Sequence, residues 1–186
     1  MKRTLALSAA FGLALLSGCA EALRPAGGDE GGPAIRTDRA EYAVSRTAQS
    51  LETTIRFEYT NRTGAAVYLP NCQGIHPVAL EKQVGGEWVT AFVPAIPLCV
   101  SPPVVVRPGE TFPYTLRVSA GLPGSHVSPK LGVDDPEGTY RLAGVVLRTW
   151  EPDGGNPELG DPLPRELRVS NEFTLREADG PDGAPE

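Results

Sequence analysis

The sequence lacks an excess of positive charge, and it lacks the apolar spacing of long helices. Its 186 residues include 17 lysines and arginines against 23 aspartates and glutamates, which gives a formal net charge of −6. Because nucleic-acid binding needs a clustered basic surface, we exclude nucleic acid as a partner. The 21 glycines and 19 prolines make up more than a fifth of the chain. That share is too high for a helical bundle and too low for a collagen-like or fully disordered chain.

The short motifs of common catalytic and metal sites are missing as well. There is no Gly-x-Ser-x-Gly sequence, no Cys-x-x-Cys pair and no calcium-binding loop of the EF-hand type. The two histidines, His76 and His126, are far apart, and a zinc site needs three or four ligands. Ser125, His126 and Asp134 could be drawn as a hydrolase triad, but adjacent side chains on a strand point to opposite sides. We therefore predict no enzyme activity, no metal site and no cofactor.

Two acidic loops leave calcium binding open. Asp134, Asp135 and Glu137 form one cluster, and a second loop contains Asp153, Glu158 and Asp161. Calcium takes oxygen ligands from loops of this kind, although acidic residues before a turn ordinarily act as turn formers.

The first 19 residues have the layout of an export signal. Lys2 and Arg3 are followed by Thr4–Leu16, which carries no charge and is mostly apolar. This stretch is too short for a permanent membrane-spanning helix, which needs roughly 20 residues. A cationic start, an apolar centre and small residues at the end are typical of secretory signal peptides.

The end of that segment, Leu16–Cys19, reads Leu-Ser-Gly-Cys and resembles the lipobox of bacterial lipoproteins at all four positions. The resemblance implies that residues 1–18 are a cleaved signal peptide and that Cys19 becomes the lipidated N-terminus. Two or three acyl chains hold a protein stably on a membrane. Because residue 20 is alanine, the resemblance implies the outer membrane in a bacterium with two membranes, and otherwise the outer face of the plasma membrane. An ordinary signal peptide with a chance cysteine is the alternative.

Composition divides the remaining chain into a tether, one domain and a tail. Residues 19–34 contain the lipidated cysteine and then a glycine-rich stretch, which predicts a flexible tether. Residues 35–176 are patterned, and their length suits one domain with its own core. Residues 177–186 predict a disordered tail. Cleavage would remove Lys2 and Arg3 and leave a charge of −8, so we expect the anchor, rather than attraction to anionic lipid, to make the membrane contact.

Alternation of apolar and polar residues predicts strands throughout residues 35–176. Leu51–Tyr59 places large apolar residues and Thr53 on one face, a period typical of a half-buried strand. Val78–Val84 and Glu87–Val93 flank two glycines and predict a hairpin. Thr139–Trp150 is apolar on both faces in its middle, as a central strand would be. Further short strands are predicted at 66–69, 104–106, 112–118, 167–169 and 173–175. The predicted fold class is all-β, a single sandwich of seven to nine strands.

Three short segments resemble immunoglobulin-like domains. Asp135–Leu142 resembles the corner before the sixth strand, where a tyrosine hydroxyl bonds to the backbone a few residues upstream; Tyr140 would have this role. The turn Pro108–Thr111 and the segment Leu80–Trp88 are similar to such domains too. The resemblance implies an immunoglobulin-like sandwich. Residue 142 is leucine where antibody domains have a cysteine, so an antibody-type domain is excluded.

Cys72 and Cys99 are the two cysteines that remain in the domain. Export would place them in an oxidising compartment, where an even pair predicts a disulfide. Closing a loop of about 27 residues would stabilise the fold by roughly 3–4 kcal/mol in the chain-entropy model. The alternatives are a metal-thiolate pair and a redox-active pair.

The segment Val93–Val105 is apolar and rich in proline, so it cannot be a central strand. It is either a covered crossover loop or an exposed patch for a protein partner. In the second case Ile96, Pro97, Leu98 and Val100 are the predicted interaction residues.

Asn61-Arg62-Thr63 matches a glycosylation sequon, which we interpret as a turn with a local side-chain bond.

We expect a monomeric, membrane-anchored protein of the cell envelope with a non-catalytic binding or structural role. The alternative is a proteinase inhibitor that presents the Ile96–Pro103 loop. The turn at Pro108–Thr111 and the Gly138-Thr139-Tyr140 segment resemble bacterial immunoglobulin-like proteinase inhibitors, which carries this alternative.

Overall fold

The computed structural model describes residues 32–96, 101–150 and 160–178, all of which lie in one compact unit that begins at Gly31. These ranges contain strands, turns and one short 3-10 turn at Arg165–Leu167, with no α-helix. No helix in the described ranges has the length and apolarity needed to cross a bilayer. The all-β fold class is confirmed.

Ten strands follow one another in the described ranges. They are β1 (Ile35–Thr37), β2 (Glu41–Arg46), β3 (Ser50–Thr60), β4 (Val67–Asn71), β5 (Val78–Val84), β6 (Glu87–Phe92), β7 (Ser101–Val106), β8 (Thr111–Gly121), β9 (Gly138–Gly144) and β10 (Phe173–Glu177).

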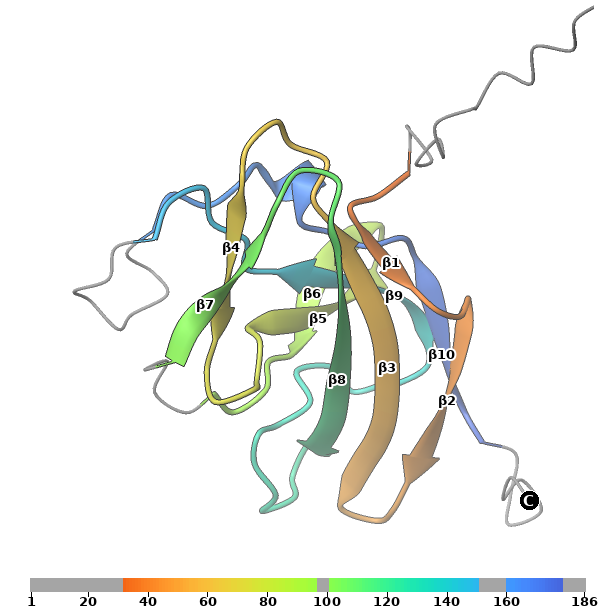
Figure 1. The fold of residues 1–186 in the computed structure, drawn as a ribbon. Coiled ribbons are helices and arrows are strands. Elements are labelled where there is room, and N and C mark those ends of the chain that lie inside the picture. Colours follow the sequence, from red (N-terminus) through yellow and green to blue (C-terminus); the bar gives the residue numbers. More distant parts are fainter. Residues whose placement is uncertain (1–31, 97–100, 151–159, 179–186) are drawn as a thin grey trace, which may run out of the picture. The chain divides into compact units, whose positions relative to one another are not determined.

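Eight of these strands form one mixed sheet (Figure 1). β1 and β8 are antiparallel to β3, on its two opposite edges, and β2 pairs with the beginning of β3. β2 is then parallel to β10, which continues into the antiparallel order β9, β5, β6. β4 and β7 form a separate two-stranded sheet. In Figure 1, β3 and β8 lie in front of β5, β6 and β9, so the large sheet bends into two layers.

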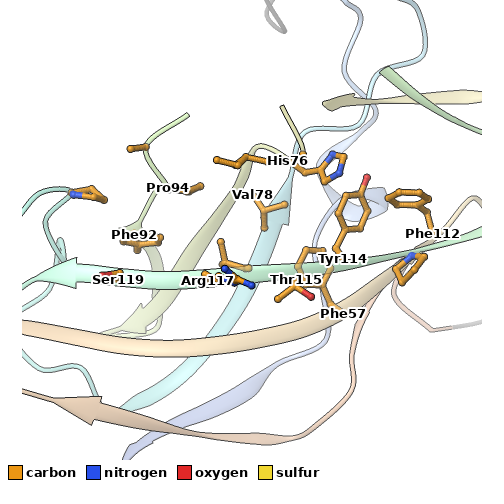
Figure 2. A pocket seen from close by; sticks show the side chains of 16 residues that line it. Phe57, His76, Val78, Phe92, Pro94, Phe112, Tyr114, Thr115, Arg117 and Ser119 are labelled. Atoms are coloured by element: carbon orange, nitrogen blue, oxygen red, sulfur yellow. The ribbon is translucent and has the colours of Figure 1, made fainter. Parts of the chain in front are cut away.

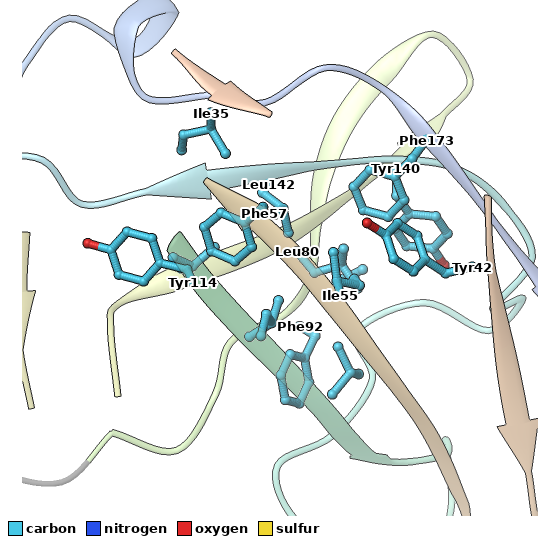
Figure 3. Close-up of a cluster of buried hydrophobic side chains, with 14 of the residues drawn as sticks. Ile35, Tyr42, Ile55, Phe57, Leu80, Phe92, Tyr114, Tyr140, Leu142 and Phe173 are labelled. Carbon is cyan, nitrogen blue, oxygen red and sulfur yellow. The ribbon is translucent and has the colours of Figure 1, made fainter. Parts of the chain in front are cut away.

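The core lies between these two layers (Figure 3). Ile55 and Phe57 extend from β3 toward Leu80 of β5, Leu142 of β9 and Phe92 of β6, and all five are buried. Complete burial of a side chain of this size stabilises a fold by about 1.5–3 kcal/mol. The alternation that predicted Leu51–Tyr59 therefore corresponds to a strand with one face in this core.

Local patterns predicted several elements correctly. The strand at Leu51–Tyr59 lies within β3, and the hairpin is formed by β5 and β6. Gly85 and Gly86 form its two-residue turn with φ values of +61° and +88°, which residues with a side chain rarely adopt. The strands predicted at 66–69, 104–106, 112–118 and 173–175 correspond to β4, β7, β8 and β10.

Two predicted strands are wrong in part. β9 ends at Gly144 instead of reaching Trp150, because the backbone turns away to other partners: Val145 donates to Pro77 O at 3.0 Å, and Leu147 exchanges bonds with Tyr68 at 2.9 Å. Residues 165–167 form the 3-10 turn, and nearby Val169 makes only an isolated bridge with Ala143. β1 and β2 were not predicted, since they are short.

The proline-rich segment is partly a strand. Ser101–Pro103 belong to β7, which pairs with β4. A proline without an N–H is tolerated in such a peripheral pair. The predicted Ile96–Pro103 loop therefore ends before Ser101.

Candidate functional site

An apolar groove runs along β8 (Figure 2). Its volume is about 590 Å³. One wall is β8, and across the groove Val78, Phe92 and Pro94 come from β5, β6 and the segment after β6. His76 and Phe112 lie at one end. We call this hollow the β8 groove.

β8 pairs with β3 along one edge, and within the described ranges no strand pairs with its other edge over Pro113–Ser119. At the end of the strand, Gly121 donates its N–H to Pro129 O and accepts from the N–H of Leu131, both at 2.8 Å. The backbone groups of Gly121 therefore face away from β3. Since this direction alternates along a strand, residues 113, 115, 117 and 119 face the same way. Pro113, which has no N–H, fits an edge of this kind.

Aromatic rings close one end of the groove. The rings of His76 and Tyr114 meet edge to face with centroids 4.3 Å apart, and Phe112 lies 4.8 Å from Tyr114. Phe57 stacks on the Tyr114 ring at 5.2 Å. Such pairs add about 0.5–1.5 kcal/mol beyond the burial of their area. Mutual contacts therefore hold the rings at this end of the groove in place.

His76 is positioned by a tight turn after β4. Cys72 and Ile75 exchange backbone hydrogen bonds at 2.8 and 3.1 Å, and Gly74 donates to Asn71 Oδ1 at 2.7 Å. Nδ1 of His76 lies 2.8 Å from Pro70 O. A carbonyl only accepts, so Nδ1 is the protonated nitrogen. Burial lowers the pKa of His76 and outweighs the opposite effect of this hydrogen bond, so the ring is neutral at pH 7.

Among the described residues, Arg117 is the only lysine or arginine that lines the β8 groove, and no aspartate or glutamate lines it. Its side chain is exposed, and the residue opposite it on β3 is Thr54. No ion pair holds Arg117 within the described part of the chain. The groove therefore combines apolar walls with a single positive charge.

Tyr59 lies behind this aromatic end and is 2% exposed. Its hydroxyl is the one buried side-chain polar atom that has no hydrogen-bond partner in the described ranges. Burial raises the pKa of Tyr59 to about 12. Burial also raises the pKa of Tyr114, and the electrostatic effect of the neighbouring Tyr59 raises it further. Both rings stay neutral.

We expect the substitution Tyr59→Phe to raise the free energy of unfolding by about 1 kcal/mol, because it removes a buried hydroxyl that gains no hydrogen bond. Urea denaturation would measure the change. Tyr140→Phe is the matched control: its hydroxyl donates to Pro136 O at 2.7 Å, so removing it should lower stability by about 1 kcal/mol. A loss of stability in both variants would contradict the prediction.

Tyr140, near the start of β9, is bonded to the turn that precedes the strand. It is completely buried, and its hydroxyl bonds to the backbone four residues upstream, at Pro136. Lys82 reinforces this corner: its ammonium donates to Asp135 O at 2.6 Å and lies 5.9 Å from the centre of the Tyr140 ring. Nothing local marks this role for Lys82, because its partner is 53 residues away.

The remaining predicted site residues are dispersed or lie outside the description. Cys72 is buried next to the turn that carries His76, and Ile96 is 36% exposed. Cys19, Pro97, Leu98, Cys99 and Val100 are outside the described residues, so the anchor, the disulfide and most of the interaction loop stay predictions.

The first acidic loop uses its carboxylates within the fold. Asp135 accepts from Glu137 N–H at 2.9 Å and from Lys82 at 3.2 Å, while Glu137 accepts from Glu177 N–H at 2.9 Å. No group of three metal-ligating side chains occurs in the described ranges. Ser125, His126 and Asp134 share no hydrogen bond there either.

A buried ion pair was also missed from sequence. Glu81, whose side chain is 7% exposed, accepts from Arg141 Nε at 2.8 Å and from an Arg165 guanidinium nitrogen at 2.5 Å. Arg141 also lies over the Trp88 ring, 4.2 Å from its centre. Burial raises the pKa of Glu81, but the hydrogen bonds and charges of the two arginines outweigh it and leave the pKa lowered.

Comparison with known proteins adds no assignment of family or function to these observations. No protein-family model matches the chain, and no curated protein is significantly similar to it.

Proposed function

We propose that this protein is a lipid-anchored protein of the cell envelope whose immunoglobulin-like domain binds a protein partner without catalysis. The observation that carries the binding role is the β8 groove, an apolar hollow of about 590 Å³ beside a free strand edge. A volume of this size is in the range of ordinary ligand sites. The described residues that line the groove include one neutral histidine and no carboxylate, which favours binding over acid–base chemistry.

Two features support the immunoglobulin-like assignment. β1, β3 and β8 group in one layer, and β10, β9, β5 and β6 group in the other. Tyr140 near the start of β9 makes the hydrogen bond of a tyrosine corner. Leu142 is the departure: it is completely buried in the core where antibody domains have a cysteine, so the domain is not of the antibody type.

The lipobox residues Leu16–Cys19 support the anchor, and export supports a disulfide between Cys72 and Cys99. Cys72 is completely buried, as a cysteine of a disulfide within a core would be. In the proteinase-inhibitor alternative, the loop presented to a proteinase would be shorter than the predicted Ile96–Pro103, since β7 begins at Ser101.

The anchor is tested by fractionation and mass measurement. We expect the protein expressed with its own leader to enter the membrane fraction, begin at Cys19 with attached acyl chains, and have two hydrogens fewer than a chain with free thiols at Cys72 and Cys99. Cys19→Ala should release it from the membrane. Cys72→Ser, which leaves the lipobox intact, is the matched control and should remain bound. A Cys19→Ala protein that is processed normally and stays firmly in the membrane would overturn the proposal.

A further inference from the structure

The free edge of β8 offers a regular row of unused backbone groups. The N–H groups of Thr115, Arg117 and Ser119 and the carbonyls of the same residues and Pro113 face away from β3. Within the described ranges, no backbone hydrogen bond reaches this row. An unpaired edge of this kind is a template for one more strand.

The short segment Pro129–Leu131 shows that the edge accepts a neighbour. It pairs with Gly121 in parallel orientation, through the two bonds at 2.8 Å. Beyond this contact, the space beside β8 opens into the groove. A strand placed there would direct alternate side chains inward, toward Val78 and Phe92, and the others outward (Figure 2).

A second copy of this chain fits the edge poorly. The core-facing side chains of its β8, such as Tyr114 and Leu116, are already buried within its own domain. They could not enter the groove, so its apolar walls would remain uncovered. Pro113 has no N–H to donate along this edge. In a symmetric pair of β8 strands, both copies would lack this donor. The occupant must instead be a segment with free apolar side chains.

Arg117 specifies the charge of that segment. It lines the groove without a carboxylate partner, and Thr54 is its neighbour on β3. On the outer face of an added strand, the residue opposite Arg117 would be favoured if it were acidic, since opposite charges across a strand pair stabilise it. The favoured segment therefore has apolar residues at alternate positions and an acidic residue opposite Arg117.

We propose that β8 binds an extended segment of a protein partner as an added strand, with apolar side chains in the β8 groove and an acidic residue opposite Arg117. This inference rests on the proposed binding function and names its ligand class. Backbone hydrogen bonds along the edge would supply affinity, and the groove and Arg117 would supply specificity.

The test uses a synthetic capped peptide of nine residues that alternates valine and glutamate, and the lipid-free mature protein. We expect binding by calorimetry, and slower amide exchange at Thr115, Arg117 and Ser119 in the complex. A peptide of the same composition in scrambled order, and one with lysine in place of glutamate, should bind at least about tenfold more weakly.

Two variants test the two contacts. Thr115→Pro removes one edge N–H and should weaken binding about tenfold, while Glu52→Ala, an exposed change on β3 outside the groove, should not. Arg117→Glu, at an exposed position, should weaken binding about tenfold and favour the lysine peptide instead. Thermal melting would verify that each variant is folded.

No binding at peptide concentrations up to about 1 mM overturns the inference. So does equal binding of the scrambled peptide, retention of affinity in Arg117→Glu, or self-association of the protein through β8. If the peptide fails while the protein remains acylated at Cys19 and membrane-bound, only the ligand class is wrong. If Cys19 is not the anchor, the proposed function itself fails.

Discussion

Replacing Asn61 with alanine is expected to lower the free energy of unfolding by about 3–5 kcal/mol, because several buried hydrogen bonds are lost together. Asn61 is 0% exposed. Its amide nitrogen donates to Ala65 O and Val106 O, both at 2.8 Å. Its amide oxygen accepts from the N–H and the hydroxyl of Thr63, at 2.9 and 2.8 Å.

The size of this effect follows from what alanine leaves behind. A single hydrogen bond contributes about 1 kcal/mol, but a buried group left without a partner costs a further 1–3 kcal/mol. The carbonyl of Val106 would lose the Asn61 amide in a buried position. The backbone of Asn61 also joins the turn, with its N–H bonded to Glu110 O and its carbonyl to Gly109 N. These contacts confirm the interpretation of Asn61–Thr63 as a turn with local side-chain bonds.

Urea denaturation would measure the change in Asn61→Ala. Thr54→Ala, an exposed change in the middle of β3, is the control and should stay within about 0.5 kcal/mol of the unmodified protein. A loss below about 1 kcal/mol for Asn61→Ala would contradict the role assigned to this side chain.

The second large effect is expected for Glu81→Ala, which should cost about 2–4 kcal/mol at pH 7, because it leaves Arg141 without its buried partner. We place the value below that of a fully enclosed ion pair, since the Arg165 side chain is 49% exposed and is partly screened by water. Glu52→Ala, an exposed position on β3, is the matched control and should have little effect.

The same pair predicts a dependence on pH. The pKa of Glu81 is lowered in the folded protein from its ordinary value of 4.5. The ionised carboxylate therefore contributes its stabilisation above about pH 4.5, and this contribution is lost as the pH falls through the lowered pKa. The stability difference between the unmodified protein and Glu81→Ala should shrink between pH 5 and pH 3. A difference that grows toward low pH would contradict the assignment.

Much of the fold was predictable because its signals are local. The alternation in Leu51–Tyr59 and the Gly85-Gly86 turn each act within a few residues. The motif around Tyr140 is local as well, because the tyrosine hydroxyl bonds to the carbonyl of Pro136, only four residues upstream. By contrast, the predicted end of the strand at Trp150 was wrong, since Leu147 pairs with the distant Tyr68 instead of continuing β9.

The β8 groove was missed although one signal for it was present. Pro113 interrupts the alternating run Phe112–Val118, and a proline inside such a run marks an edge strand. The sequence indicates that one edge is unpaired, but not what lies beside it. His76, Val78 and Phe92 are distributed over a turn and two strands, and only folding places them across from β8.

The sequence by itself determined the all-β class and the hairpin, because strand period and turn glycines are properties of adjacent residues. The lipid anchor stays a prediction from the four adjacent residues of the lipobox. Only the tertiary structure decided which strand edge stays open and which charges meet. Those outcomes depend on pairs such as Glu81 with Arg165, 84 positions apart, and the patterns of two distant segments do not specify whether they meet. The β8 groove belongs to this second class.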